Sequence, residues 1–161
     1  LDIAGDGPQR AYLERRAAEL GIERRVTLHG YLRHEQLRRL YCNADVFALP
    51  SVVMGRYGRQ DVIPNVLAEA MAAGLPVIGS AIGGVAELVE DGTDGLLVPQ
   101  RDVGALADAL EKLYREPDLA RRLSVAARKK VERIWDRERN LEELAEIFET
   151  YSPDGPEGLA A

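Results

Sequence analysis

Residues 64–80 read Pro-Asn-Val-Leu-Ala-Glu-Ala-Met-Ala-Ala-Gly-Leu-Pro-Val-Ile-Gly-Ser, and this stretch decides the fold. Pro64 suits the start of a helix, because its φ angle is already helical and its missing N–H is not needed there. The helix is expected to end near Ala73, since Gly74 favours termination and Pro76 prevents continuation. Residues 77–80 then form a short strand without charge. The stretch therefore predicts a helix that leads into a buried strand of a parallel sheet.

The same alternation of strand and helix extends to both sides. We expect short strands at residues 1–4, 26–29, 45–49, 77–80 and 96–98, with amphipathic helices between them. After Asp102 the leucines recur only at helical spacing. This pattern predicts an α/β fold with a doubly wound parallel sheet, helices on both faces and further helices at the C-terminal end. Trp135, beside Ile134 at the end of one of these helices, is interpreted as a packing residue. One domain is expected over residues 1–151, followed by a flexible tail at 152–161, which holds two prolines and two glycines.

Composition excludes several classes of protein. The chain has 161 residues and a net charge of −6, which gives no electrostatic support for binding nucleic acid. Its single cysteine, Cys42, and two histidines exclude a disulfide framework and a His/Cys metal cluster, so no metal site is expected. Cys42 is instead expected to be a small core residue on an apolar helix face. No apolar run approaches the roughly 20 residues that span a bilayer. The first residues lack the basic segment of a signal peptide, and we expect a cytoplasmic protein.

A candidate ligand site surrounds the start of the central helix. Parallel α/β sheets bind ligands beyond the carboxyl ends of their strands. Glu69 lies in a largely apolar helix, where a carboxylate is costly unless it is hydrogen-bonded, and ribose hydroxyls would satisfy it. Asn65 shares its face, four residues away. The amides of Asn65, Val66 and Leu67 suit a phosphate. The alternative is an ordinary capped helix in which Glu69 pairs with an arginine.

Several motifs in order resemble a known family. Asp61 and Glu69 are separated by seven residues, and Ala-Met-Ala-Ala-Gly-Leu-Pro-Val-Ile follows. This resembles the Glu-x7-Glu hallmark of retaining glycosyltransferases of the GT-B fold, family four (glycosyl transferases group 1). Blocks at residues 3–8, 26–32, 44–51, 83–89 and 91–98 are similar to the family's other motifs. The resemblance covers residues 1 to about 151 and implies the C-terminal, donor-binding domain. The loop at 50–60 is similar to that of members that build bacterial exopolysaccharides.

The resemblance implies a reaction and a set of donor contacts. A hexose would pass from a nucleotide diphosphate sugar to an acceptor hydroxyl with retention at the anomeric carbon, without a metal or other cofactor. Asp61 would be the catalytic position, close to the reacting carbon, and Glu69 would bind the ribose. The pyrophosphate would be held by the amides of Asn65, Val66 and Leu67. The nucleobase would be flanked by the backbone of Tyr31 and Leu32. Two further donor contacts are implied at Ile63 and Gly5.

Two departures from the family bear on activity. Asp61 is one methylene shorter than the usual glutamate, and Val62 stands where the family usually has glycine. In addition, the family's domain begins one strand and one helix earlier, with a Gly-Arg motif and a lysine that grip phosphate. That first strand is central in the usual doubly wound order, so we expect the sheet to be open between its neighbours. The N-terminal acceptor domain is a further expected partner, and the parent protein is expected to be peripheral to a membrane. We therefore expect weak binding and no turnover from these residues alone, with Arg56 and Arg59 as possible substitutes for phosphate charge.

Two other functions stay open. The first is a nucleotide-sugar epimerase or hydrolase on the same scaffold, which the carboxylate spacing disfavours. The second is a non-catalytic domain that binds a partner protein, which the shortened Asp61 favours. A dinucleotide-binding enzyme is disfavoured, because Gly5-Asp6-Gly7 is followed by Arg10 where the fingerprint needs a third glycine.

Overall fold

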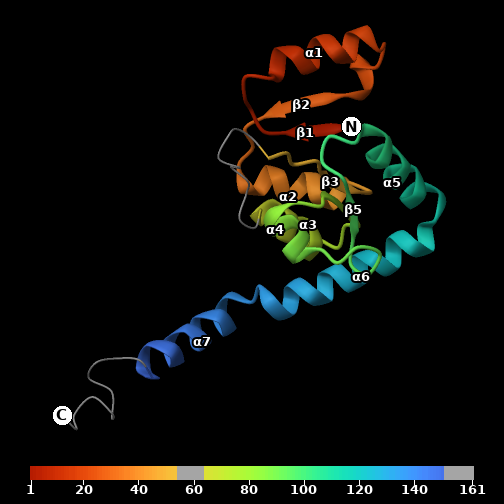
Figure 1. Cartoon of the computed structure of the whole chain (residues 1–161). Helices are drawn as coiled ribbons and strands as arrows, with labels where there is room; N and C mark the ends of the chain where they lie inside the picture. Colours follow the sequence, from red (N-terminus) through yellow and green to blue (C-terminus); the bar gives the residue numbers. More distant parts are fainter. Residues whose placement is uncertain (54–63, 151–161) are drawn as a thin grey trace. The chain divides into compact units, whose positions relative to one another are not determined.

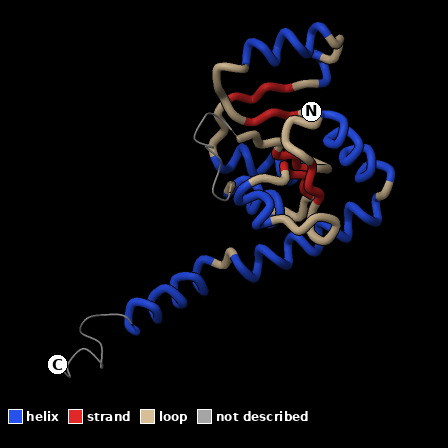
Figure 2. The backbone as a smooth tube through the Cα atoms, in the orientation of Figure 1, coloured by secondary structure: helices blue, strands red, loops and turns tan. Residues whose placement is uncertain are grey.

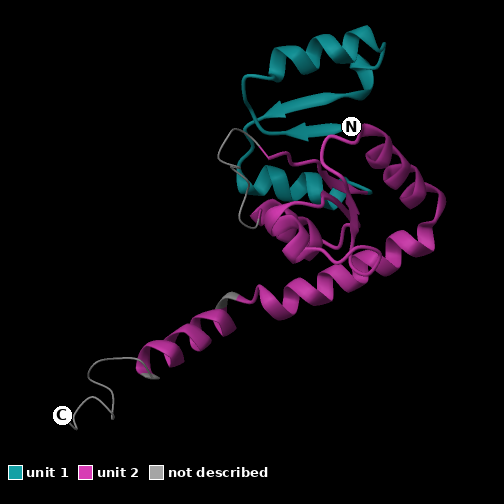
Figure 3. Cartoon of the chain, viewed as in Figure 1, with its two compact units in different colours: residues 1–45 teal, residues 46–161 magenta. Residues whose placement is uncertain are grey.

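A computed structural model describes residues 1–53 and 64–150 of the chain (Figure 1). Strands and helices alternate as far as β5, and helices alone follow (Figure 2). The chain divides into two compact units, Leu1–Asp45 and Val46–Ala161 (Figure 3). The predicted boundary at residue 151 lies next to residues outside the described part, and it stays a prediction.

The first unit is a two-stranded parallel sheet with helices. Its elements are β1 (Asp2–Ala4), α1 (Arg10–Glu19), a 3₁₀ turn (Glu23–Arg25), β2 (Thr27–Gly30) and α2 (His34–Asn43). The strands pair with Asp2 opposite Thr27, and the register shifts between Ile3 and Ala4. Figure 2 shows the two strands running side by side. The predicted order of strand, helix, strand and helix is therefore observed in this unit, with ends that differ by one or two residues.

The second unit contains a three-stranded parallel sheet with β4 in the centre, in the order β3–β4–β5. Its elements are β3 (Phe47–Leu49), α3 (Asn65–Ala72), β4 (Val77–Ser80), α4 (Gly83–Leu88), β5 (Leu96–Val98), α5 (Val103–Arg115), α6 (Pro117–Ile134) and α7 (Arg137–Thr150). All four residues of β4 are buried, which explains its uninterrupted lack of charge.

Helices cover both faces of this sheet. Ile78 in β4 packs in one cluster with Leu113 of α5 and Leu123 of α6. The next residue, Gly79, faces α4, because a Cβ atom added to it would collide with the side chain of Val85. Successive residues of a strand point to opposite faces, so α4 covers one face while α5 and α6 cover the other. The predicted α/β fold class with parallel strands and helices on both faces is confirmed.

The strands form two separate ladders, which agrees with the expected opening of the sheet. Among the described residues β1 hydrogen-bonds only to β2, and β3 only to β4 within its sheet. Each of these strands therefore has one edge without a ladder partner in the described part of the chain.

Local signals that end α3 are observed as predicted. Gly74 has a left-handed backbone (φ +79°), which glycine adopts without steric cost. Its N–H donates to the carbonyl oxygen of Met71 at 3.0 Å, and the N–H of Leu75 donates to that of Ala70 at 3.1 Å. This pair of bonds is the Schellman arrangement that closes a helix C-terminus. These bonds define where α3 ends and where the chain turns toward β4.

A buried carboxylate ties the turn before β5 to α6. Asp94 is almost completely buried and accepts a hydrogen bond from the N–H of Glu90 at 2.8 Å. Its other oxygen pairs with Nζ of Lys130 in α6 at 2.7 Å. In the same turn Asp91 accepts the N–H of Leu97 at 2.8 Å. The pair of Asp94 and Lys130 therefore fixes α6 to the turn before β5, near the C-terminal end of α6.

Helix α7 carries an uncovered apolar face. Leu141, Leu144, Ile147 and Phe148 recur at helical spacing, as the sequence predicts, and all four are exposed. None of the described helices has the length and apolar character needed to cross a membrane.

Candidate functional site

Helix α3 presents Asn65 and Glu69 on one face. Leu67, Ala70 and Met71 are fully buried and anchor the opposite side of the helix. Glu69 is half-buried and Asn65 is exposed. Both line the same cavity, as expected from their spacing of four residues. Glu69 is therefore not enclosed by apolar neighbours, which is the condition that the ligand hypothesis needs.

The cavity lies between α3 and the C-terminal end of α6 and has a volume of about 640 Å³. Small apolar side chains, an aromatic ring, an amide and three carboxylates line it: Ala68, Ala72 and Val131; Trp135; Asn65; Glu69, Glu132 and Asp136. Carboxylates accept hydrogen bonds from hydroxyls, and an aromatic face packs against an apolar ring surface. None of these lining residues is basic. The cavity therefore suits a hydroxyl-rich ring better than a phosphate.

The amides proposed for phosphate follow Pro64 directly. Pro64 occupies the N-cap position of α3 and offers no side-chain cap. Its carbonyl accepts the N–H of Leu67 at 2.9 Å. The Leu67 amide is thus used inside the first helical turn, and a phosphate would have to share or replace that bond. Asn65 and Val66 lie in the same first turn, and their phosphate role stays a prediction.

Two predicted site residues, Asp61 and Ile63, lie outside the described residues, as do Arg56 and Arg59. Their assignment as catalytic, donor-contacting or charge-compensating positions stays a prediction.

In the first unit, the carboxyl ends of β1 and β2 bring Gly5 close to the Tyr31 turn. The N–H of Gly5 donates to the carbonyl of Gly30 at 2.8 Å, immediately before Tyr31. Both glycines have positive φ (+121° and +68°), so the chain leaves both strands through backbone that other residues rarely adopt. Tyr31 is 85% exposed and Leu32 is half-buried. These residues stand at the strand end where such sheets bind ligands, and their role toward a nucleobase stays a prediction.

Sequence reasoning missed the α6 side of the cavity. Trp135 was interpreted as a packing residue, yet it is 39% exposed and lines the cavity. Glu132 in the last turn of α6 and Asp136 just beyond its end also line the cavity, four residues apart in the sequence. That spacing of two acids around an aromatic residue is a signal in the sequence, but only the fold places it opposite Glu69.

No group of three or more His, Cys, Asp or Glu side chains in residues 1–53 and 64–150 is placed to hold a metal ion. The prediction that the donor binds without a metal or cofactor is not tested by this observation.

A family profile described as "Glycosyl transferases group 1" matches residues 1–130. Among curated proteins, the amylovoran biosynthesis glycosyltransferase AmsK of Erwinia amylovora is 38% identical over 148 residues, which are 91% of this chain. The chain spans only 36% of the length of that relative.

Solved structures agree on the fold. A sucrose-phosphate synthase from Thermosynechococcus elongatus is similar with a TM-score of 0.77 and 32% identity, over 92% of this chain and 37% of that one. The HepE protein of Anabaena in complex with UDP-glucose has a TM-score of 0.75 and 24% identity, over 90% of this chain and 40% of that one.

Proposed function

Because the chain belongs to the glycosyl transferases group 1 family, we propose that it forms the donor-binding part of a retaining glycosyltransferase. In this proposal a hexose passes from a nucleoside diphosphate sugar to an acceptor hydroxyl with retention at the anomeric carbon. The observation that carries it is the cavity that Glu69 and Asn65 line together. A buried structural carboxylate would not need such an opening.

The lining residues have separate roles in the proposal. The Glu69 carboxylate accepts hydrogen bonds from the ribose hydroxyls, and Trp135 packs against the apolar side of the ring. Asp61 contacts the donor sugar near its reacting carbon. Its side chain keeps the charge of a glutamate with one methylene less reach, and a small misplacement at a reacting centre can reduce the rate strongly.

The acceptor side belongs to the rest of the parent protein. The chain spans about a third of the relatives' length, so the proposal assigns acceptor binding to the remaining part. The similarity to a protein named for amylovoran biosynthesis supports an acceptor in bacterial exopolysaccharide assembly. The parent would work in the cytoplasm at the periphery of a membrane, and the isolated chain would bind donor without turnover.

Calorimetric titration of residues 1–161 with UDP tests the donor site. Glu69→Gln keeps the shape of the side chain and removes its charge. We expect about a tenfold weaker affinity, because a hydrogen bond to a charged group is worth roughly 1.5–3 kcal/mol and every 1.4 kcal/mol is tenfold. Glu87→Gln makes the same change on the exposed side of α4 and serves as the control. An unchanged affinity in Glu69→Gln, or no binding of UDP, GDP or ADP by the wild type, would overturn the proposal.

Product analysis of the parent protein separates the alternative activities. A labelled nucleotide sugar should yield a glycoside of the acceptor with the donor's anomeric configuration. Release of free sugar would indicate a hydrolase, and recovery of an isomerised nucleotide sugar an epimerase. Binding without any product from the parent would support a non-catalytic domain.

A further inference from the structure

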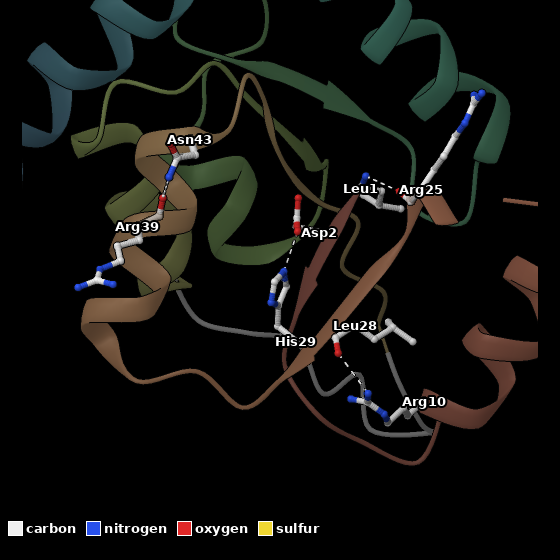
Figure 4. A network of polar contacts seen from close by, with 8 residues as sticks. All are labelled: Leu1, Asp2, Arg10, Arg25, Leu28, His29, Arg39 and Asn43. Atoms are coloured by element: carbon white, nitrogen blue, oxygen red, sulfur yellow. Dashed lines mark hydrogen bonds and ion pairs between the residues drawn. The ribbon is translucent and has the colours of Figure 1, made fainter. Parts of the chain in front are cut away.

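Arg10 connects the start of α1 to the end of β2. Its Nη2 donates a hydrogen bond to the carbonyl of Leu28 at 3.1 Å, across 18 residues of sequence (Figure 4). Its Nε pairs with Oε1 of Glu14, one helical turn further along α1, at 3.1 Å. The guanidinium plane is therefore fixed from two directions, by the helix that carries it and by the strand that it contacts.

The same guanidinium packs against the turn that carries Tyr31. A Cβ atom added to Gly30 would lie 3.5 Å from Nη1 of Arg10, so these groups are already in near contact. Gly30 is buried, has a φ of +68° and accepts the N–H of Gly5. Arg10 is thus hydrogen-bonded to β2 at Leu28 and has Nη1 beside Gly30, where the chain turns toward Tyr31.

A second ion pair on α1 shows what an ordinary surface pair looks like. Arg16 and Glu19 are 3.0 Å apart and similarly exposed, and the bonds described for Arg16 stay within α1. Exposed pairs of this kind contribute only about 0–1 kcal/mol to stability. The two arginines differ in the contact with β2, so a test that compares them isolates that contact.

We infer that Arg10 is a positioning residue for the nucleobase-binding turn at residues 30–32. This rests on the proposed function and on the role that the family resemblance implies for Tyr31 and Leu32, whose backbone would flank the base. By fixing the carbonyl of Leu28 and packing on Gly30, Arg10 selects one conformation of the turn among those open to a glycine. Removing it releases the turn, which weakens base contacts and base discrimination while the Glu69 side of the donor site is unchanged.

Calorimetric titrations of residues 1–161 with UDP and with GDP test the inference. Arg10→Ala should weaken binding of the preferred nucleotide about tenfold, the loss expected for one charge-assisted hydrogen bond. The ratio of the two dissociation constants should move toward one, which a uniform loss of stability would not cause. Arg10→Lys keeps the charge and one donor and should recover part of both effects. Arg16→Ala is the matched control and should behave as wild type.

The outcomes separate this inference from the function on which it rests. If Arg10→Ala binds both nucleotides within twofold of wild type while Glu69→Gln is weakened, Arg10 has no positioning role and the donor site stands. If the two dissociation constants rise by the same factor, Arg10 is only structural and the inference fails. If the wild type binds neither of these nucleotides nor ADP, both proposals fail. Should Arg10→Ala unfold by circular dichroism, the ratio for Arg10→Lys decides, and a wild-type ratio there contradicts the inference.

Discussion

The ion pair between Asp94 and Lys130 offers a sharp test of how α6 is held. Asp94 accepts two hydrogen bonds, and its side chain is 5% exposed. Lys130→Met removes the ammonium group and keeps most of the aliphatic stem. The carboxylate then stays buried with the N–H of Glu90 as its remaining described donor, and a buried charge that loses its partner is costly.

The magnitude follows from the exposure of the two partners. Removing one partner of a fully buried pair costs about 3–5 kcal/mol. The side chain of Lys130 is 21% exposed, so water reaches part of the pair and reduces the loss. We expect Lys130→Met to lower the free energy of unfolding by about 2 kcal/mol. The exposed pair of Arg128 and Glu132 on the same helix should contribute less than about 1 kcal/mol.

Urea unfolding followed by fluorescence measures this loss. Trp135 is the single tryptophan of the chain and directly follows α6, so its emission reports on the second unit. A double-mutant cycle with Asp94→Asn should show a coupling of about 1–2 kcal/mol, because the neutral amide no longer needs the ammonium. Arg128→Met is the control. A loss below about 0.5 kcal/mol for Lys130→Met, or single losses that simply add in the double variant, would refute the reasoning.

Two further predictions concern packing in the second unit, and urea midpoints check both. Gly95→Ala should lower the free energy of unfolding by about 1–3 kcal/mol, because the new Cβ would lie 2.8 Å from Cγ2 of Val77 and 3.1 Å from the backbone oxygen of Val77. Gly104→Ala, where the nearest atom is 3.4 Å away, should instead stabilise α5 by about 0.5–1 kcal/mol. Equal urea midpoints for the two variants would contradict this prediction. Leu123→Ala should cost about 2–5 kcal/mol, since its side chain is completely buried against the sheet; a loss below 1 kcal/mol would show that α6 is not packed as described.

The sequence predicted elements well where short-range signals decide them. Gly74 and Pro76 set the end of α3, and the uncharged run at 77–80 matches β4 residue for residue. These outcomes depend on backbone sterics within a few residues, which a sequence displays directly. The separation into two ladders was expected from the resemblance, because the family's central strand is not among these residues.

The prediction for Cys42 was wrong. It was expected in the core on an apolar face of α2, but it is exposed, whereas the adjacent Tyr41 is buried. Neighbouring residues on a helix are about 100° apart, so a small error in the position of the buried stripe exchanges them. The cavity beside Glu69 was unpredictable for a different reason: residues 65–72 and 131–136 meet only through the packing of α3 on α6.

The apolar face of α7 bears on how readily the isolated chain associates with itself. Leu141, Leu144 and Phe148 are interleaved with glutamates, so the patch that would make two molecules adhere is framed by charges that push them apart. The net charge of −6 at neutral pH makes the molecules repel one another, which opposes aggregation. Near the isoelectric point of about 5.1 the net charge is close to zero and the repulsion is lost. We therefore expect mild acid to favour association of molecules through the exposed face of α7.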